Sequence, residues 1–441
     1  MTNLFDFDIS DKNPINQTTI GFLPKKVVIP FEQESNFKCT NVVSKGESVR
    51  EGQVIAEVSR DVYGVKSFGT SKIHSPIPGK VLDIKNCSFP NGKQGKAIEI
   101  LLEGNFTYIG KEPRILDWKN YSPAMLLRSI SESGVINTFS NNYFPSFEIE
   151  TNKLRDYDEK KLFVRLFDED PSCRIDSSLV RSELKKIIIG IYIVSKIIEA
   201  NEIIISYSTD LNFESLLSGE LKTYLSSIPV KYMPIDTKYY PAGGKQELVN
   251  SFIKQNKLSE NSESIEKSSM FIDANTLVHV YNSVVLNIPV EYVNIFVDGD
   301  CLQAKALLKV PIGTTLNHIA SQCGGFVKKM NKIIINGNVK GVSINDLNTP
   351  ITKYVKSITF SSEKNNFASD FGFCIHCGKC RAVCKAEICP DLIYSSVMEG
   401  THIEKIYIDS ASLCSDCEVC SFVCPSKLPL SKVIKLVKDE R

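Results

Sequence analysis

The cysteines near the C-terminal end of the sequence are the residues best suited to chemistry. The 441 residues include fourteen cysteines, and nine of these lie between Cys374 and Cys424. Eight of the nine form two runs with the spacing C-x2-C-x2-C-x3-C, namely Cys374, Cys377, Cys380, Cys384, Cys414, Cys417, Cys420 and Cys424. Because a cytoplasmic chain does not keep ordinary disulfides, cysteines at such short spacing indicate a metal site.

This spacing resembles that of bacterial ferredoxins, in which three cysteines of a run bind one [4Fe–4S] cluster and the fourth binds the other. The resemblance implies two clusters, with the following ligands. One takes Cys374, Cys377, Cys380 and Cys424, and the other takes Cys384, Cys414, Cys417 and Cys420. Structural zinc is the alternative, but zinc sites favour separate cysteine pairs over repeated runs of four. We therefore predict an electron-transfer protein.

A ninth cysteine lies beside the first run. Cys384 is followed by Lys385, where proline is usual in this motif, and Cys389 comes five residues after Cys384. No base partner for Cys389 is visible, so the pattern favours a plain buried thiol over an alternative ligand or a redox-active group. His376 and Lys379 are interpreted as solvated loop residues rather than ligands.

Composition argues against several classes of function. Lys and Arg total 52 against 51 for Asp and Glu, so no global field attracts nucleic acid or an acidic membrane surface. The longest apolar run, 187–198, contains Lys196 and is shorter than the ~20 residues of a spanning helix, which predicts a core helix and no transmembrane segment. The first residues, MTNLFDFDIS, show no signal-peptide pattern, and we expect a cytoplasmic protein.

The sequence pattern before the cysteine runs changes twice. Residues 1–110 contain short Val- and Ile-rich runs between Gly and Pro turns, which predicts a small β-barrel or sandwich. Residues 115–290 alternate helical and strand patterns, which predicts an α/β domain, with a polar surface loop at 255–269. Residues 291–362 are again β-rich with one helix, and residues 363–441 carry the cysteines.

Two stretches of the first segment resemble a known fold. Val43–Gln53 and Ser75–Val81 are similar to the two halves of the barrel-sandwich hybrid of biotinyl and lipoyl domains. In those domains a lysine at a hairpin tip receives the cofactor, and no hairpin of that kind follows Ser75. We therefore interpret the fold as structural rather than as a cofactor carrier.

Further segments make the chain resemble the RnfC-like family over nearly its full length. They are Pro24–Pro30, His74–Val81, Tyr240–Gln246, Val297–Asp300, Gly341–Lys353 and the SKLPL after Cys424-Pro425. The resemblance implies a multidomain α/β and β protein with four domains. These are a barrel-sandwich hybrid (1–110), a degenerate relative of the flavin- and NADH-binding α/β domain of NADH dehydrogenases (115–290), an SLBB-like β-grasp domain (291–362) and an α-helical ferredoxin-type domain with two clusters (363–441).

The nucleotide-binding loop of the family is altered here. The family has a glycine-rich G-x-G-G-A-x-F-P-T loop, whose bare backbone lets FMN phosphate and nicotinamide approach closely. In the matching stretch Gly134 stands at the start, and only Phe144 and Pro145 remain of the loop itself. A second family segment corresponds to Arg165–Pro171, which keeps acidity but loses asparagine and glycine. We predict that FMN and NADH binding are lost or much weakened.

Two functions follow from the resemblance. The first is a carrier that relays electrons through two [4Fe–4S] clusters to a partner reductase, as in the family branch associated with clostridial D-proline reductase. The second is an RnfC-type subunit of a membrane ion-translocating NADH:ferredoxin oxidoreductase complex with an atypical flavin and NADH site. The eroded loop favours the first. Both require redox protein partners, and membrane association would come through a complex. A zinc-bearing interaction module is the non-redox alternative.

Overall fold

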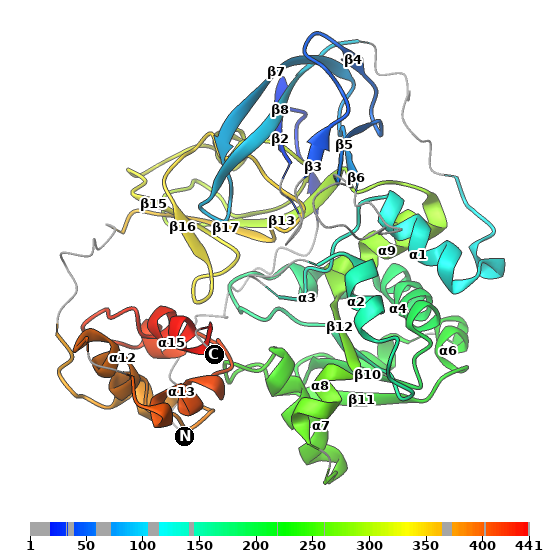
Figure 1. The fold of residues 1–441 in the computed structure, drawn as a ribbon. Coiled ribbons are helices and arrows are strands. Elements are labelled where there is room, and N and C mark those ends of the chain that lie inside the picture. The colour runs from blue at the N-terminus through cyan, green and yellow to red at the C-terminus, as the bar shows by residue number, and fades with distance from the viewer. Residues whose placement is uncertain are drawn as a thin grey trace. The chain divides into compact units, whose positions relative to one another are not determined.

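The computed structural model describes residues 18–31, 33, 39–58, 72–104, 114–140, 145–217, 219–259, 261–363, 373–400 and 403–439 (Figure 1). The chain divides into two compact units. The first comprises Met1–Gly337 and Gly341–Ser362, and the second comprises Asn338–Lys340 and Glu363–Arg441. Each unit is described separately.

The N-terminal part of the first unit consists of two small antiparallel sheets. One has the strand order β2-β8-β7-β4 and the other β3-β5-β6. The strands are β2 (Lys26–Pro30), β3 (Cys39–Asn41), β4 (Ser48–Val49), β5 (Val54–Val58), β6 (Lys72–His74), β7 (Gly79–Ser88) and β8 (Gln94–Leu102). Gly46 and Gly52 have φ of 86° and 74°, a conformation that glycine adopts without strain. Their positions explain the glycines of the predicted turns.

A parallel four-stranded sheet follows, with the order β11-β10-β9-β12. The strands are β9 (Lys161–Arg165), β10 (Glu202–Ser208), β11 (Val230–Ile235) and β12 (Ser269–Asp273). The chain runs from β9 to one side and returns to the other side with β12. The topological switch therefore lies between β9 and β12, and open α/β sheets bind ligands outside the carboxyl ends of the strands at such a point.

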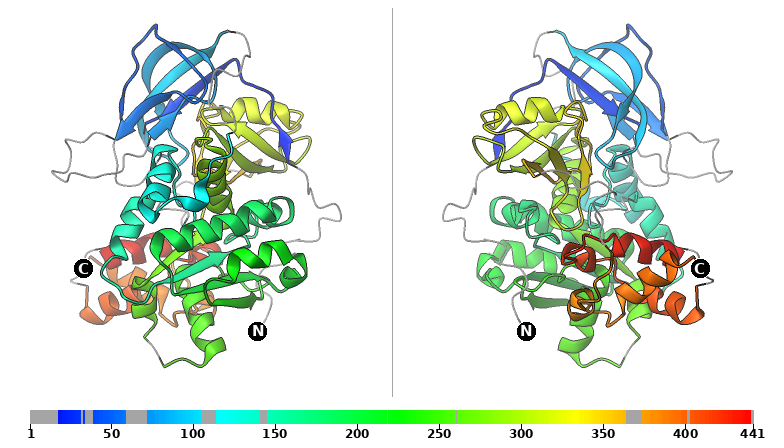
Figure 2. Two further views of the ribbon diagram at one scale, coloured as in Figure 1. Left: turned by 90° about the vertical axis from the view of Figure 1, so that its right-hand side faces the viewer. Right: turned by 90° about the vertical axis from the view of Figure 1, so that its left-hand side faces the viewer.

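Helices cover both faces of this sheet (Figures 1 and 2). Along β9, Leu162 and Val164 enter one core while Phe163 enters the other, because successive strand side chains point to opposite faces. The first face packs against α1 (Pro123–Glu132), α3 (Ile175–Ser182), α4 (Leu184–Ile198) and α9 (Ala274–Leu286). The other packs against α7 (Lys245–Asn256) and α8 (Ser262–Lys267). The remaining elements are η1 (Trp118–Asn120), α2 (Phe147–Lys153), α5 (Phe213–Leu216) and α6 (Gly219–Leu225).

One expected loop is wrong and one expected helix is found. The stretch 255–269 contains α8, because Asn261 caps the helix by accepting a hydrogen bond from the Glu263 amide (3.0 Å) and Ile265 is buried in the core. A single buried isoleucine among polar residues gave too weak a periodic signal. The apolar run 187–198 lies in α4, as predicted. Within the described ranges, no helix is long and apolar enough to cross a membrane.

A mixed six-stranded sheet completes the first unit, with the order β1-β14-β13-β17-β15-β16. Its elements are β1 (Thr19–Ile20), β13 (Tyr292–Asp298), β14 (Ala306–Pro311), α10 (Leu316–Gln322), β15 (Lys332–Ile335), β16 (Val342–Ile344) and β17 (Ser357–Ser361). Strand β1 comes from the beginning of the chain and pairs in parallel with β14. The sheet is therefore closed on one edge by a segment far away in the sequence.

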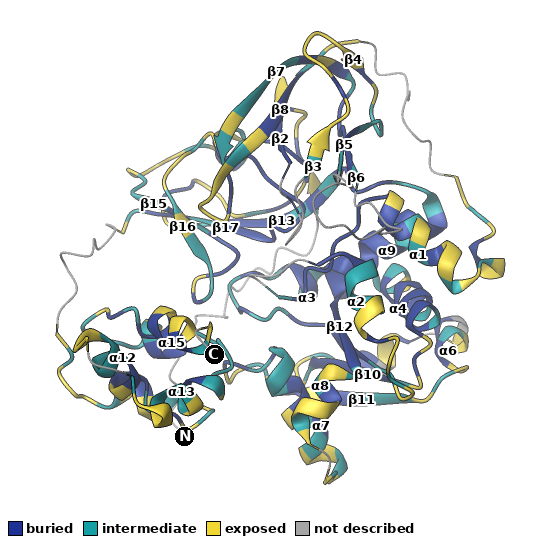
Figure 3. Cartoon of the chain, viewed as in Figure 1, coloured by how far each residue is buried: buried dark blue, intermediate teal, exposed yellow. Residues whose placement is uncertain are grey.

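The second unit is helical over its described residues. Its helices are α11 (Lys379–Val383), α12 (Pro390–Met398), α13 (Lys405–Ser412), α14 (Val419–Phe422) and α15 (Leu430–Asp439). Helix α15 buries Leu430, Val433, Ile434 and Val437, the i, i+3, i+4, i+7 pattern of an amphipathic helix (Figure 3). This small core holds the two cysteine runs in place.

Candidate metal centre

The two cysteine runs fold as copies of one local structure, displaced by 40 residues from Cys374 to Cys414. Each run bends through residues with positive φ, and the pairs correspond: His376 (51°) with Asp416 (54°), and Gly378 (71°) with Glu418 (63°). A short helix follows in each copy, α11 or α14, and then a longer one, α12 or α15. The repeated bends let several sulfurs of one run face the same space.

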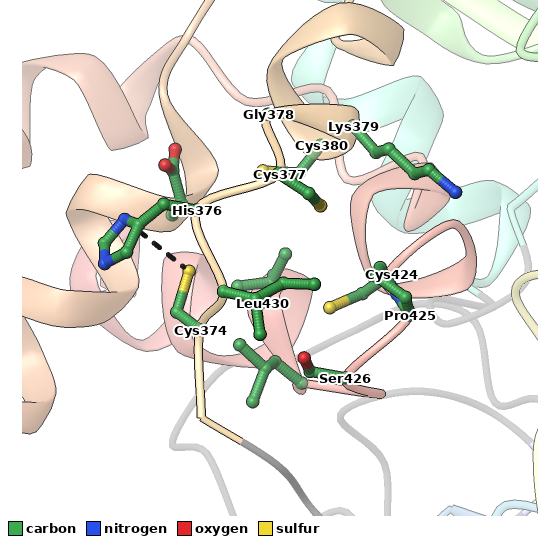
Figure 4. Close-up of a pocket in the computed structure, with 13 residues that line it drawn as sticks. Cys374, His376, Cys377, Gly378, Lys379, Cys380, Cys424, Pro425, Ser426 and Leu430 are labelled. Atoms are coloured by element: carbon green, nitrogen blue, oxygen red, sulfur yellow. Dashed lines mark hydrogen bonds between the residues drawn. The ribbon is translucent and has the colours of Figure 1, made fainter.

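The first hollow is lined by three cysteines of the first run and one of the second. Cys374, Cys377, Cys380 and Cys424 surround one open space, with Leu430 beside it (Figure 4). The hollow encloses about 340 Å³, part of it open to solvent. The structure therefore brings together the four residues that the ferredoxin resemblance assigns to one cluster.

The second hollow has the reciprocal lining. Cys414, Cys417 and Cys420 come from the second run, and Cys384 comes from the first. This hollow encloses about 380 Å³, again partly open to solvent. The exchange of the fourth cysteine follows from helices α11 and α14, each of which carries the chain from its own hollow toward the other.

The four sulfurs of each hollow suit a group larger than a single ion. A zinc ion holds each sulfur about 2.3 Å away, so its ligands crowd closely together. In the described part of the chain, the group of three donor atoms found within 4.8 Å of one another contains only one cysteine: Cys374, with His376 and Asp391. Asp391 is engaged elsewhere, by two hydrogen bonds of 2.7 Å from the Arg381 guanidinium. The donor set therefore fits iron–sulfur clusters better than zinc.

Burial controls the acidity of the thiols. It raises the pKa of Cys380 and of Cys414 to about 11, and that of Cys420 to about 12. Metal binding requires the thiolate form, and a bound metal supplies the positive charge that stabilises it. These three thiols are consequently poor nucleophiles in the absence of a bound metal.

Cys389, the ninth cysteine, lines neither hollow. It is half-buried and stands at the N-cap of α12, at the position that Pro429 occupies in the second copy. The thiol is less buried than predicted, and its role as a plain thiol stays a prediction. His376 and Lys379 both line the first hollow, and Lys379 extends outward (Figure 4).

A second candidate site is the carboxyl edge of the parallel sheet in the first unit, where the chain's own side chains fill the switch point. The Arg165 guanidinium, 1% exposed, stacks on the Phe139 ring with its central carbon 4.1 Å from the ring centroid. It donates hydrogen bonds to the carbonyl oxygens of Gly243 (2.7 Å) and Phe139 (2.8 Å). Arg165 therefore occupies the space at the end of β9.

The stretch that replaces the glycine-rich loop contributes to this filling. Asn137 donates hydrogen bonds to Glu150 (2.5 Å) and to the carbonyl oxygen of Phe271 (2.7 Å). The Thr138 hydroxyl donates to Asp273 (2.9 Å), and both Asn137 and Thr138 are buried. Side chains at these positions are thus integral parts of the core.

Gly134 and Pro145, which the sequence retains, have structural roles here. A Cβ at position 134 would overlap the carbonyl oxygen of Lys72 and crowd the Lys353 ammonium. That ammonium is buried and donates to the carbonyl oxygens of Lys72 (2.9 Å) and Gly134 (2.7 Å). The Pro145 carbonyl accepts from the Asn137 amide (3.1 Å), while Phe144 lies outside the described residues. The Lys353 contacts join the segment after α1 to strand β6 and to the segment before β17.

The acidic Arg165–Pro171 segment is likewise used locally. Asp168 accepts hydrogen bonds from the amides of Asp176 (2.9 Å) and Ser177 (3.1 Å) at the start of α3. Asp170 accepts from the Ser172 amide (3.0 Å). The acidic residues of this segment therefore have local structural roles: Asp168 caps helix α3, and Asp170 stabilises a turn.

A buried ion triad, which the sequence analysis did not identify, lies at the same edge. The Lys356 ammonium contacts Asp176 (2.9 Å) and Asp273 (2.5 Å), and all three side chains are at most 5% exposed. Burial raises the pKa of Asp176 to about 7. Burial also acts to raise the pKa of Asp273, but the charges of Lys356 and Arg165 and the hydrogen bonds from Lys356 and Thr276 together outweigh it and lower this pKa to about 2. No local pattern signals this triad, since its members are far apart in sequence.

Comparison with known proteins shows what this chain is similar to. Residues 8–105 match the family model described as the RnfC Barrel sandwich hybrid domain. The chain is 24% identical over 377 residues to the C-type subunit of the proton-translocating ferredoxin:NAD(+) oxidoreductase complex of Clostridium ljungdahlii, covering 85% of this chain and 79% of that one. It is 26% identical over 418 residues to the C-type subunit of the ion-translocating oxidoreductase complex of Buchnera aphidicola, covering 93% and 83%. The chain is therefore similar to RnfC-type subunits over most of its length, which bears out the predicted RnfC-like resemblance.

A further relative is also the C-type subunit of an ion-translocating complex. The C-type subunit of the Na(+)-translocating ferredoxin:NAD(+) oxidoreductase complex of Acetobacterium woodii is 22% identical over 387 residues, covering 86% of this chain and 83% of that one. Among solved structures, an NAD+-reducing [NiFe]-hydrogenase chain in the H2-reduced state aligns with a TM-score of 0.48 at 12% identity, covering 71% of this chain and 61% of that one. The three named relatives are all subunits of oxidoreductase complexes.

Proposed function

We propose that this chain is an electron-transfer subunit that binds two [4Fe–4S] clusters in its second unit, one in each hollow. The observation that carries the proposal is the exchange of ligands: each hollow is lined by three cysteines of one run and the fourth of the other. This arrangement requires both runs to fold together, and it provides four thiolates for each cluster. When bound, such clusters supply one-electron transfer.

The protein part of the site positions and shields these clusters. Positive φ at Gly378 and Glu418 turns the backbone between the second and third cysteines of each run, so that successive sulfurs face one side. Apolar residues of the small core, including Ile388, Leu428 and Ile434, lie around the hollows and limit water access. Shielding of this kind influences the potential of a cluster.

The partners that the relatives support are other members of an oxidoreductase complex. The relatives from Clostridium ljungdahlii and Acetobacterium woodii belong to complexes that translocate ions and act on ferredoxin and NAD(+). We therefore place this chain as an RnfC-type subunit, in preference to the partner of a D-proline reductase that the eroded loop favoured. Attachment to a membrane would come through such partner proteins.

Within that role, we infer that the first unit binds FMN and NADH weakly or not at all. Relatives of this kind take part in NAD(+) chemistry, which argues for retention of a nucleotide site. Against it stands the carboxyl edge of the parallel sheet, where Arg165, Phe139 and Thr138 occupy the switch point and bond to the chain itself. Electrons would then enter from a partner protein rather than from NADH on this chain.

Anaerobic purification of the full chain tests both parts. Cluster binding predicts iron and sulfide in equal amounts, filling both sites, and reduction by dithionite that gives electron paramagnetic resonance signals of two clusters. Zinc in place of iron would overturn the electron-transfer function. Stoichiometric flavin, or reduction of the clusters by NADH alone, would contradict the filled nucleotide site while leaving the clusters in place.

A further inference from the structure

The two copies of the cysteine structure differ in their charges. Each hollow is lined by one exposed lysine, Lys379 in the first and Lys385 in the second, so these charges match. The first hollow also contains Asp391, which Arg381 neutralises through two hydrogen bonds of 2.7 Å. Arg381 and Asp391 correspond to Ser421 and Ser431 of the second copy, a neutral pair with 2.8 Å between the hydroxyls. Neither the two lysines nor these two residue pairs make the net charge of one hollow differ from that of the other.

Glu418 is a charged residue in the lining of the second hollow that has no charged equivalent in the lining of the first. It lines the second hollow at the position that Gly378 occupies in the first. Among the described residues no cation forms an ion pair with Glu418. Asp416, its neighbour in the same loop, is instead paired with Lys438 (3.0 Å). Glu418 therefore places a carboxylate in the lining of the second hollow that no ion pair with a described residue offsets. Three lysines act on the Glu418 carboxylate only at longer range, namely Lys340, Lys432 and Lys435.

The backbone makes this acid unexpected on conformational grounds. Glu418 has φ of 63°, a conformation that is unfavourable for a residue with a side chain and that glycine adopts freely. The equivalent Gly378 has φ of 71° with open space around it, because a Cβ there would meet nothing within 4 Å. The same bend thus accepts either residue, and the carboxylate at 418 is placed against its local preference.

We propose that Glu418 makes the cluster in the second hollow the harder of the two to reduce, so that an electron entering the chain rests in the first hollow. The proposal rests on the two-cluster function given above. Reduction adds one negative charge to a cluster, and a nearby carboxylate opposes it. A unit charge about 10 Å away, at an effective dielectric constant of about 20, shifts such an equilibrium roughly tenfold.

A redox titration of the anaerobic full-length protein tests this order. Dithionite supplies one electron to each cluster, and electron paramagnetic resonance follows the two reductions as separate waves. Glu418→Gln is expected to raise the reduction potential of the lower-potential wave by about 59 mV, which corresponds to a roughly tenfold change in the one-electron reduction equilibrium. The potential of the upper wave should not change. Movement of the upper wave, or of neither, would overturn the proposal.

Two further variants complete the design. Gly378→Glu introduces the same carboxylate into the first hollow and is expected to lower the upper wave by a similar factor. Glu399→Gln removes an exposed carboxylate that lines neither hollow, and it should move neither wave. If the two clusters of the unmodified protein were reduced at the same potential, the proposed order would be refuted, although the presence of two clusters would not. Absence of iron would instead refute the underlying function.

Discussion

The cysteine-rich unit and the carboxyl edge of the parallel sheet use their polar groups in opposite ways. In the two hollows, eight cysteines line open space. At the sheet edge, Arg165, Thr138 and Lys356 all bind groups of the same chain. The polar groups at the sheet edge are therefore part of the packing of the first unit, whereas the cysteines of the hollows are placed to bind a group held between them.

Removal of one cluster ligand is the change with the largest expected effect. Cys420→Ala should abolish the cluster of the second hollow and halve the iron content, because three cysteines cannot complete the four-thiolate site. Iron and sulfide analysis of the anaerobic protein measures this. Cys389→Ala is the matched control, since Cys389 lines neither hollow, and it should retain all the iron. Equal losses in both variants would show that Cys389 is a ligand.

Replacing Lys356, the buried cation of the ion triad, tests how much the triad at the sheet edge contributes to stability. Lys356→Met leaves Asp176 and Asp273 buried without their shared partner, and we expect it to destabilise the first unit by about 3–5 kcal/mol. Urea denaturation followed by circular dichroism measures the change. The control is Lys328→Met, which breaks the exposed pair with Asp300 (3.5 Å) and should cost less than about 1 kcal/mol. If both variants lost similar amounts of stability, the triad would not be an important source of stability for the first unit.

The buried side chain of His279, on α9, should make the stability of the first unit depend on pH. Burial lowers its pKa to about 4, whereas an unfolded histidine titrates near 6.5. Between these values the unfolded chain binds the additional proton, so stability rises with pH across this window and falls on acidification, by up to about 3 kcal/mol. Denaturation at several pH values should show a shallower slope in His279→Leu. An unchanged slope would indicate that water reaches this side chain.

The smallest expected effect compares the two bends of the cysteine runs directly. Gly378→Ala should destabilise the second unit by about 1 kcal/mol, because it places a Cβ at positive φ in otherwise open space. Glu418→Gly should stabilise it by a similar amount for the opposite reason. Thermal denaturation of the cluster-loaded protein provides the measurement. Shifts in the same direction for both variants would mean that contacts, rather than backbone conformation, decide these positions.

Much of the fold could be predicted from local pattern. The run that became α4 has helical periodicity, and the apolar stretches of β9, β10 and β12 are continuous because both faces of that sheet are covered. Helix α8 was missed because one buried residue, Ile265, holds it in the core. The pairing of β1 with β14 joins segments nearly 300 residues apart, and no local signal encodes it.

The two cysteine runs and their ligand-like spacing can be read directly from the residues, because covalent spacing sets which thiols can converge on one cluster. The RnfC-like resemblance can be read from its short motifs. Those ligand assignments remain predictions. The surroundings of these residues depend on the tertiary fold. It leaves Glu418 without the counter-ion that Asp391 has, among the described residues, and it places Arg165 and Lys356 at the sheet edge. These are contacts between residues distant in sequence, and their energies depend on burial that no local pattern reports.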